Sequence, residues 1–439
     1  MNFKNGNYKV VAVIPAKGSS ERIKSKNLRL IDGEPLVFRA LRRCIESNFF
    51  DEVWLDTDSD EIIEVCSDLE CKVLKREKKF ATNNTDGNGL LLNEIKNIQS
   101  DYYCQILCTS PFLDINSVKH AFEKLITSDV YDSIVAGSTD SFYQWIDKKP
   151  SYDLQNIPNS KDLVSTFNES MGVYIIKKDI ALKFKRRIGN NPFFLELNPV
   201  ELIDVNYEKD LKLANLISGG IREEENSKLR LLSRILSSAL ISDVMDSIGY
   251  TNNFINHDLT ANISNKKLFG RVKTLSMRNI KNGENVEDIY DSHNIYENIK
   301  INDLLVVNNK TNFSFFGEIN SSFAIRSGAS GAIIFGPTRD IEATRSFDFP
   351  VYYKSLCSKD IRGRGMLESF NKKININGVD ISPNQLAFID NEGMVIIPKE
   401  IEDRVIKTSV EKISSESSII KGISEGLNNR NLMKDFGHF

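Results

Sequence analysis

At 439 residues the chain is too long for one ordinary core, so we expect two or three domains of ~100–200 residues each. Its 57 Lys and Arg nearly balance its 60 Asp and Glu, and the net charge of −3 excludes a global attraction for nucleic acid or an anionic membrane. No apolar run approaches the ~20 residues of a membrane-spanning helix, and the stretch before Val10 leaves no room for a signal peptide. We therefore expect a cytoplasmic protein with neither a nucleic-acid nor a membrane partner.

The cysteines and histidines predict no zinc site and no disulfide framework. The six cysteines lie mostly inside apolar patterns and include no CxxC pair, which is typical of reduced thiols. The four histidines are scattered, without the spacing of zinc ligands. A metal site would therefore rest on carboxylates, and oxygen ligands combined with phosphates suit Mg²⁺.

The first half alternates short apolar runs with segments of helical periodicity. Strands are expected at 10–14, 53–55, 105–108, 133–136 and 172–176, and helices at 36–47, 60–67 and 115–127. Such alternation is typical of crossover units. We therefore predict an α/β fold with a mainly parallel sheet in this half.

A loop rich in cations and small residues follows the first expected strand. It spans 17–27 and carries the cations Lys17, Arg22 and Lys26. Backbone N–H groups beside Gly18 and Ser19 can face an anion that these cations neutralise. The GxxxxGK[ST] and GxGxxG patterns are both absent. The loop predicts a polyphosphate site, and an ordinary solvated basic turn is the alternative interpretation.

The pattern of the first half stops near Gly220, where a polar and charged stretch begins. We place a first domain at 1–221, a linker at 222–228 and a second domain at 229–439. In the second half we expect helices at 229–240 and 404–426, strands at 304–307, 331–335, 351–353, 386–389 and 394–397, and a turn at Asn377-Gly378.

Four blocks of the first half resemble, in the same order, the CMP-sugar cytidylyltransferases, which activate acylneuraminate, related nonulosonates and ketodeoxyoctonate with CTP. The blocks are Ile14 to Asn27, Thr57-Asp58, Thr109-Ser110-Pro111, and Ile203 to Asn206 with Asp210 behind it. The resemblance implies a Rossmann-like nucleotidyltransferase domain with a mainly parallel mixed sheet. Such a domain transfers CMP from CTP to a sugar acid and releases pyrophosphate, mainly by positioning the reactants and neutralising charge.

The resemblance also implies roles for individual residues at the nucleotide. The residues expected there are Lys17, Gly18, Ser19, Arg22, Lys26 and Asn27. Arg76 matches a basic residue of the family and would contact the nucleotide or the sugar acid, with a surface arginine as the alternative. Asp58 would contact the nucleotide or form an Asx turn and helix cap ahead of Asp60.

Asp204 is the expected Mg²⁺ ligand, and with Lys26 it is an expected catalytic residue. A carboxylate at the end of the strand-like Leu202-Ile203 would meet a metal ion that bridges phosphate oxygens. Asn206 stands where the family often has a second Asp, and it would leave a neutral oxygen ligand. An aspartate that merely forms a turn is the alternative.

The acceptor side departs from the family pattern. Thr109, Ser110 and Asn168 are expected to contact the acceptor. Leu107 and Leu113 replace an amide and a cation that the family often has in this segment. A site built without those groups should accept a different or less polar acid than N-acetylneuraminate.

The second half resembles the RraA-like proteins, which include regulators of ribonuclease E and class II 4-hydroxy-4-methyl-2-oxoglutarate aldolases. The blocks that carry this resemblance are Ser242-Asp243 with Asp246, Asp303 to Val307, Gly317-Glu318-Ile319, Arg326 with Gly331, Gly336 to Asp340, and Asp390 to Pro398. The resemblance implies a swivelling β/β/α domain that assembles as a trimer or a dimer of trimers.

A second site is implied around Arg339. Arg339 would hold a 2-oxo acid carboxylate, while Asp340 would bind a divalent ion that stabilises a pyruvate enolate. Further residues expected at this site are Glu318 through metal-bound water, the amides at Gly317 and Ile319, and Glu416 from across a subunit interface. A structural ion pair between Arg339 and Asp340 in a non-catalytic domain is the alternative.

The two resemblances together predict Mg²⁺-dependent transfer of CMP to a 2-keto-3-deoxy sugar acid, fused to a metal-dependent pyruvate aldolase-like module. The alternative is a cytidylyltransferase for another acid, such as a phosphonate, with a non-catalytic oligomerisation or regulatory module. Expected partners are CTP, the acceptor acid, pyruvate or another 2-oxo acid, and further copies of the chain in a dimer, trimer or hexamer.

Overall fold

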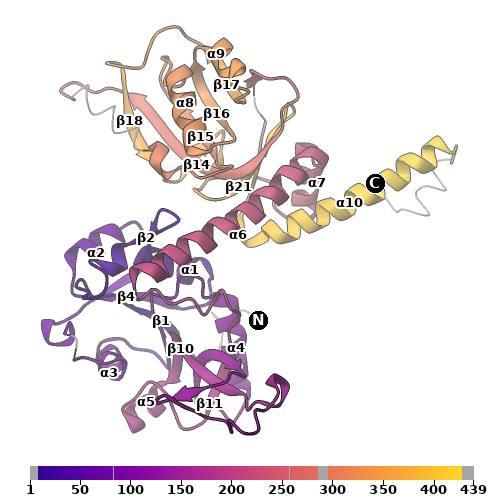
Figure 1. Ribbon diagram of the computed structural model, residues 1–439. Helices are drawn as coiled ribbons and strands as arrows, with labels where there is room; N and C mark the ends of the chain where they lie inside the picture. The colour runs from indigo at the N-terminus through magenta and orange to yellow at the C-terminus, as the bar shows by residue number, and fades with distance from the viewer. Residues whose placement is uncertain (1–7, 83, 257, 285–294, 428–439) are drawn as a thin grey trace. The chain divides into compact units, whose positions relative to one another are not determined.

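The computed structural model describes residues 8–82, 84–256, 258–284 and 295–427. It divides into two compact units, unit 1 at Met1–Gly220 and unit 2 at Ile221–Phe439, which run from indigo to magenta and from magenta to yellow in Figure 1. Three of the four histidines, His257, His293 and His438, lie outside the described residues. All six cysteines are free thiols.

A seven-stranded sheet forms the centre of unit 1, in the order β11-β7-β10-β6-β1-β4-β5. The strands are β1 (Val10–Pro15), β4 (Glu52–Thr57), β5 (Lys72–Lys75), β6 (Tyr102–Ile106), β7 (Ser133–Asp140), β10 (Thr166–Lys177) and β11 (Pro192–Glu196). Only β10 runs antiparallel to its neighbours in this path, β6 and β7. The predicted Rossmann-like, mainly parallel mixed sheet is confirmed.

Helices cover both faces of this sheet. The helices are α1 (Leu36–Glu46), α2 (Asp60–Val65) and α4 (Ile115–Thr127) on one face, and α3 (Gly87–Asn97) and α5 (Lys178–Phe184) on the other. Strand β1 has apolar side chains on both faces of the sheet, and both faces are therefore covered. Ala12 and Ile14 pack on the first face, and Val11 and Val13 pack on the second. A strand buried on both faces reads as a continuous apolar run. Short elements complete the unit: β2 (Leu30–Ile31), β3 (Glu34–Pro35), β8 (Trp145–Ile146), β9 (Lys149–Pro150), and the 3₁₀ turns Lys26–Leu28, Lys78–Phe80 and Ser160–Asp162.

The predicted strand at Leu202-Ile203 is wrong, because the chain turns there. The backbone N–H groups of these two residues donate to the carbonyl oxygens of Asn198 and Val200. The buried carboxylate of Glu201 accepts hydrogen bonds from Asn198 and from the Asp114 backbone N–H, which stabilises the turn. Asp204 therefore lies on a loop rather than at the end of a strand.

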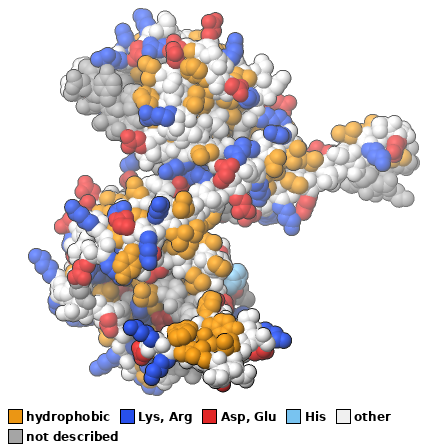
Figure 2. Space-filling model, in the orientation of Figure 1, with side chains coloured by type: hydrophobic (Ala, Val, Ile, Leu, Met, Phe, Trp, Pro, Cys, Tyr) orange, Lys and Arg blue, Asp and Glu red, His pale blue; other side chains and the backbone are white. Residues whose placement is uncertain are grey.

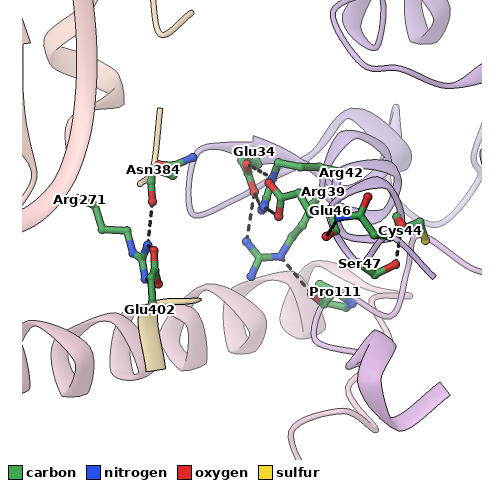
Figure 3. A network of polar contacts seen from close by, with 11 residues as sticks. Glu34, Arg39, Arg42, Cys44, Glu46, Ser47, Pro111, Arg271, Asn384 and Glu402 are labelled. Carbon is green, nitrogen blue, oxygen red and sulfur yellow. Dashed lines mark hydrogen bonds and ion pairs between the residues drawn. The ribbon is translucent and has the colours of Figure 1, made fainter. Parts of the chain in front are cut away.

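The predicted linker at 222–228 lies inside one continuous helix, α6 (Glu208–Ile235), so the expected start of a helix at Leu229 is wrong. Glu, Lys and Arg are strong helix formers, and such a charged stretch can extend a helix as readily as it can form a loop. Within unit 2, Arg222 pairs with Asp303 at 3.2 Å. The Arg271 guanidinium pairs with Glu225 in α6. It also pairs with Glu402, as Figure 3 shows.

Unit 2 is built on a nine-stranded sheet, in the order β12-β22-β21-β14-β15-β16-β17-β13, with β18 paired to β14. The strands are β12 (Phe254–Ile255), β13 (Thr260–Ala261), β14 (Leu268–Asn279), β15 (Leu304–Asn309), β16 (Gly331–Thr338), β17 (Val351–Leu356), β18 (Gly365–Phe370), β21 (Leu386–Ile389) and β22 (Met394–Ile397). Strands β14 to β17 are parallel, and the other strands pair antiparallel.

Three apolar layers hold unit 2 together. One lies between the parallel strands and α8 (Glu318–Ser327). A second lies between those strands, β21–β22 and the hairpin of β19 (Ile374–Ile376) and β20 (Val379–Ile381). The third lies between β21–β22, the end of α6, α7 (Ser238–Ser247) and α10 (Glu402–Ser424). This arrangement agrees with the expected β/β/α layering, and α9 (Ile341–Ser346) completes the unit.

The predicted turn at Asn377-Gly378 is confirmed. Both residues have positive φ, 51° and 89°, and they join β19 to β20, as a two-residue hairpin of this sequence requires. Among the described helices, none combines the length and apolar character needed to cross a bilayer.

Candidate functional site

A cavity of about 510 Å³ opens in unit 1 where several strands of the sheet end. Its lining includes Pro15 at the end of β1, Arg76 just after β5, and Leu107 just after β6. The carboxyl edge of a mainly parallel sheet is where loops from different strands converge on a ligand. We call this cavity the strand-edge pocket.

The cation-rich loop forms one wall of the strand-edge pocket. Lys17, Arg22 and Lys26 all line it, and so does Ser19. Burial lowers the pKa of the Lys26 ammonium below its ordinary value, while Asp204 acts in the opposite direction. A cation that is partly desolvated in this way gains strongly from a polyphosphate placed beside it.

Two contacts within unit 1 fix the shape of this loop. The Asn27 amide donates to the Lys17 carbonyl oxygen at 2.8 Å and accepts from the Cys108 thiol at 3.1 Å. Asn27 is therefore buried in the pocket wall with its amide already used by the protein. Burial raises the pKa of the Cys108 thiol to about 11, so it remains a neutral donor.

Gly18 and Asp58 lie behind the loop rather than among the lining residues. The Gly18 N–H donates to Asp58 Oδ1 at 2.9 Å, and a Cβ at Gly18 would lie 2.8 Å from the Ser59 Cβ. The N-cap of α2 is Ser59, whose hydroxyl accepts from the Ile62 N–H. The interpretation of Asp58 as the helix cap is therefore wrong, and its carboxylate fastens the loop instead.

Asp204 and Asn206 meet beside the cationic wall. The Asn206 amide donates to Asp204 Oδ2, and Asn206 lines the strand-edge pocket. Asp204 Oδ1 is buried and has no hydrogen-bond partner among the described residues. Asp210 serves a different purpose, because its carboxylate accepts from the backbone N–H groups of Asn206 and Tyr207 at the start of α6.

This donor set fits a Mg²⁺ ion that is held mainly by its substrate. Such an ion takes one or two carboxylates from the protein and fills its other positions with phosphate oxygens and water. Asp204 Oδ1, which has no partner among the described residues, would supply one carboxylate ligand. The described residues contain no group of three or more His, Cys, Asp and Glu that could enclose a metal ion by themselves.

Arg76 lies in the pocket wall and not on the surface, so the surface alternative is wrong. Its side chain is buried and lines the strand-edge pocket. Nε and Nη2 each donate to one carboxylate oxygen of Asp56 at 2.9 Å, and Nη2 also donates to the Asp56 carbonyl oxygen. A two-point pair of this kind holds the guanidinium plane in one orientation.

The structure separates the residues expected at the acceptor. Thr109 lines the pocket, but Asn168 does not and instead lies on β10 with its amide directed toward Asp140 and the Thr166 carbonyl oxygen. The Ser110 hydroxyl is buried and finds no hydrogen-bond partner within the described ranges, and a Cβ at Gly172 would lie 2.8 Å from it.

The two leucines that replace family residues have different environments. Leu107 lines the pocket, whereas Leu113 is only 1% exposed and packs in the core between the sheet and its helices. The cation that the family often has at the second position would therefore point into a core here.

Arg187 is a pocket residue that the sequence did not reveal. Its guanidinium lies 3.6 Å from the centre of the Tyr174 ring and lines the strand-edge pocket. Arg187 follows α5 in a run of basic residues that looks like an ordinary solvated surface. Arg187 lies far from the loop at 17–27 in sequence, so the sequence gave no signal that the two are close in space.

Arginines of α1 hold the segment that follows Thr109. Arg43 donates to the carbonyl oxygens of Ser110 and Leu113 at 3.0 and 2.7 Å, and Arg39 donates to that of Pro111 at 3.0 Å. Figure 3 shows Arg39 between Pro111 and Glu34. Glu34 also pairs with Arg42.

We expect Arg43→Met to lower the free energy of unfolding by about 2–4 kcal/mol, because two carbonyl oxygens lose a buried donor. Arg230→Met is the control, since Arg230 is an exposed arginine that pairs with the exposed Glu223, and we expect a loss of about 1 kcal/mol or less. Urea denaturation measures both values. Equal losses in the two variants would contradict this assignment.

Unit 2 brings Arg339, Asp340 and the start of α8 together. The Glu318 N–H donates to Asp340 Oδ2 at 3.2 Å, and a Cβ at Gly317 would lie 2.6 Å from the same oxygen. Arg339 Nη2 lies 2.6 Å from Asp360, and Nε lies 3.4 Å from Asp340. Asp360 is a partner of Arg339 that the sequence did not indicate.

The other expected residues of this second site are exposed. Ile319 is 67% exposed at the first turn of α8, and Glu416 is exposed on α10. No contact in unit 2 links Glu416 to Arg339 among the described residues.

Comparisons with known proteins divide the chain in the same way. Residues 11–213 match the family model described as Cytidylyltransferase, and residues 238–396 match the one described as Aldolase/RraA. The N-acylneuraminate cytidylyltransferase A of Danio rerio is 26% identical over 248 residues, which are 53% of this chain and 56% of the relative. The pseudaminic acid cytidylyltransferase of Campylobacter jejuni is 34% identical over 124 residues, 27% of this chain and 53% of the relative.

The chain thus spans about half the length of these curated relatives. Among solved structures, RraAS2 of Streptomyces coelicolor, described as an unusual member of the RNase ES inhibitor RraA protein family, matches with a TM-score of 0.38. It is 19% identical, and the match covers 43% of this chain and 93% of that one. Both resemblances seen in the sequence are confirmed by the family models. The chain therefore joins a region that matches the cytidylyltransferase family model, in unit 1, to a region that matches the aldolase/RraA family model, in unit 2.

Proposed function

We propose that unit 1 transfers CMP from CTP to a 2-keto-3-deoxy sugar acid and releases pyrophosphate. The observation that carries this proposal is that three cations line one pocket and that one of them, Lys26, interacts with Asp204, whose buried Oδ1 has no partner among the described residues. The names of the relatives support it, since they are cytidylyltransferases for N-acylneuraminate and pseudaminic acid.

In this reaction a hydroxyl of the acid attacks the α-phosphate of CTP, and pyrophosphate leaves. Lys17, Arg22 and Lys26 would neutralise the negative charge on the triphosphate and on the leaving pyrophosphate. Asp204 and Asn206 would hold Mg²⁺, which supplies charge neutralisation and orients the phosphates. The protein's main contribution would be to position the reactants.

The pocket also supports an acidic acceptor. Arg187 presents a planar cation that suits a carboxylate, and Leu107 and Met171 line the pocket with apolar surface. This combination favours an acid that carries apolar substituents over one that needs an amide partner at position 107.

The test is pyrophosphate release from CTP and Mg²⁺ with a panel of acceptors. The panel contains N-acetylneuraminate, pseudaminate, ketodeoxyoctonate and simple phosphonates. We expect release with at least one keto sugar acid and less with N-acetylneuraminate than with a less polar acid. Pyrophosphate release with phosphonates alone would show that the acceptor is a phosphonate and not a sugar acid. No pyrophosphate release with any acid would refute the proposal.

For unit 2 we propose a divalent-metal-dependent, pyruvate aldolase-like activity that forms or cleaves the acid that unit 1 activates. Arg339 would bind the 2-oxo acid carboxylate, with Asp340 and Glu318 at the metal. In the structure Arg339 already pairs with Asp360, so a bound oxo acid would have to compete with that carboxylate. The same pair supports the second candidate, a non-catalytic oligomerisation or regulatory module.

We expect Arg339→Ala to abolish pyruvate turnover, measured with candidate aldehydes and a divalent metal, while light scattering shows unchanged assembly. Lys373→Ala is the matched control, because Lys373 is an exposed cation of unit 2 that pairs with Asp380. Turnover that survives in Arg339→Ala would show that Arg339 does not bind the oxo acid. No turnover by the unaltered protein with any aldehyde would favour the non-catalytic module.

An apolar surface on unit 1 supports a homo-oligomer. The exposed residues Phe142, Trp145, Ile146, Ile157 and Val164 come from one segment, 142–164, and Figure 2 shows hydrophobic side chains gathered on the lower part of unit 1. Contiguous apolar patches of this kind mark interaction sites. We propose that a second copy of the chain covers this surface, and the light-scattering experiment also measures this association.

A further inference from the structure

Four polar side chains form a buried cluster behind one wall of the strand-edge pocket. Asp56 and Glu94 have no exposed surface, Gln105 is 2% exposed and Arg76 is 5% exposed. They come from β4, α3, β6 and the residue after β5, respectively. Arg76 and Gln105 also line the pocket, so the cluster connects the interior of unit 1 with its ligand site.

The cluster contains one more acidic group than basic groups. Arg76 donates two hydrogen bonds of 2.9 Å to the Asp56 carboxylate, one from Nε and one from Nη2. The third nitrogen of the guanidinium, Nη1, is left for a ligand. Gln105 Nε2 donates to Glu94 Oε2 at 2.8 Å. Glu94 Oε1 has no donor among the described residues. An ionised Glu94 would be an unpaired buried charge, which is among the most costly states a side chain can have.

A proton on Glu94 removes this cost. Burial raises the pKa of Glu94 to about 8, and the neighbouring charge of Asp56 raises it too, whereas Gln105 and Arg76 act in the opposite direction. These three residues face Glu94 from β4, from β6 and from the end of β5. Tyr103 of β6 also interacts electrostatically with Glu94, and its hydroxyl donates to the Ile98 carbonyl oxygen. Once protonated, the Glu94 carboxyl group becomes a donor, and the Asp56 carboxylate lies within hydrogen-bonding reach of it.

We propose that Glu94 is a positioning residue that acts as a neutral carboxylic acid, and that it holds Arg76 and Gln105 at the wall that receives the base of the nucleotide. The proposal rests on the proposed function of unit 1. Glu94 would donate to Asp56, which orients Arg76, and accept from Gln105, which orients that amide.

The surroundings of this wall suit a pyrimidine base. Phe80 and Leu90 line the pocket beside Arg76 and offer flat apolar surface to a ring. Arg76 Nη1 is a donor, and Gln105 Oε1 is a buried acceptor without a partner among the described residues. A donor and an acceptor side by side are what the edge of cytosine, with its ring acceptors and its amino group, requires.

The arrangement makes nucleotide binding sensitive to alkaline pH. When Glu94 ionises, a second negative charge lies against Asp56 and the donor to Asp56 is lost. Arg76 is then drawn into the cluster and away from the ligand. We therefore expect the KM for CTP to rise about tenfold at one pH unit above the pKa of Glu94, with little change in kcat.

Three variants test the role of Glu94. Glu94→Gln keeps one donor and one acceptor without an ionisable proton, so its KM should stay close to that of the unaltered protein at neutral pH and remain flat at alkaline pH. Glu94→Met removes both functions and should raise the KM for CTP by about tenfold or more at every pH. Glu64→Gln, an exposed glutamate of α2, should keep the alkaline rise unchanged.

Stability gives a second readout that needs no substrate. Because the folded-state pKa is raised, the stabilising contribution of this proton is complete below the unfolded pKa of ~4.3 and is lost as the pH rises through about 8. Glu94→Gln should remove that part of the pH dependence of unfolding. Infrared difference spectra between neutral and alkaline pH should also lose the band of a protonated carboxylic acid in Glu94→Gln.

The outcomes separate this inference from the proposed function. If no acid is turned over, calorimetric binding of CTP replaces KM in the same three variants. CTP that does not bind at all, with the infrared band present, would refute the proposed function and the role of Glu94 in positioning a base. Normal CTP turnover with an alkaline profile that is identical in Glu94→Gln and the unaltered protein would refute this inference alone.

Discussion

Asp204→Ala and Asp204→Asn are both expected to lower kcat/KM for CTP by ~10³-fold or more, which is several kcal/mol of transition-state stabilisation. In the part of the chain that the structure describes, Asp204 Oδ1 is a buried oxygen without a hydrogen-bond partner, next to the cationic wall of the strand-edge pocket. Such an atom is costly unless a ligand completes its contacts. A Mg²⁺ ion bound with the triphosphate would do so, and neither Ala nor Asn supplies the charge that binds it.

The asparagine variant decides between a metal ligand and a turn former. Asn forms turns as well as Asp does, and its oxygen could still accept from Asn206. If Asp204 only shapes the loop, Asp204→Asn should be nearly as active as the unaltered protein. If it binds Mg²⁺, both variants should fail, and the Mg²⁺ concentration for half-maximal pyrophosphate release should rise in any residual activity.

The sequence was sufficient for the parts of unit 1 that are determined by local pattern. The apolar run at 10–14 predicted a strand, and β1 forms there with Ala12 and Val13 packed on opposite faces of the sheet. The loop at 17–27 followed from its cations, because a strand that ends at a sheet edge must deliver the next residues there. Lys17 and Lys26 accordingly line one pocket.

Features that depend on distant partners could not be read from the sequence. Arg76 pairs with Asp56, which lies twenty residues away in sequence, and both interact with Glu94 of α3. Neither the burial of Arg76 nor the proton on Glu94 therefore has a local signature in the sequence. Arg187 approaches the pocket from the end of α5 and looked like surface. Leu113 was expected to shape the acceptor site. Instead, its carbonyl oxygen accepts a hydrogen bond from Arg43 of α1, and its side chain packs in the core.

The misplaced linker has a different cause. Composition alone does not separate a charged loop from the charged face of a helix, and Gly219 and Gly220 suggested a break. In the structure both glycines lie within α6, where a Cβ would meet no atom within 4 Å. Glycine weakens a helix by only about 1 kcal/mol per residue, which the packing of Leu211 in unit 1 and Leu229 in unit 2 can offset.

Lys26→Met is expected to raise the KM for CTP and lower kcat, with a combined loss of about 3–4 kcal/mol, or ~10²–10³-fold in kcat/KM. Lys26 faces Asp204 and the other loop cations, and burial lowers the pKa of its ammonium. A triphosphate restores the favourable surroundings of that charge, so binding energy is concentrated at this residue rather than spread evenly over the loop. Lys26→Arg should recover part of the loss, because it retains the charge with a different shape.

Lys24→Met is the matched control for this prediction. Lys24 lies in the same loop, but it is exposed and is not among the residues that line the strand-edge pocket, so its removal should change kcat/KM by less than about threefold at moderate ionic strength. If the loop acted only as a diffuse positive field, the two methionine variants would lose activity equally, and both losses would shrink together as salt is added. A large loss confined to Lys26, and resistant to salt, requires a direct contact with the phosphates.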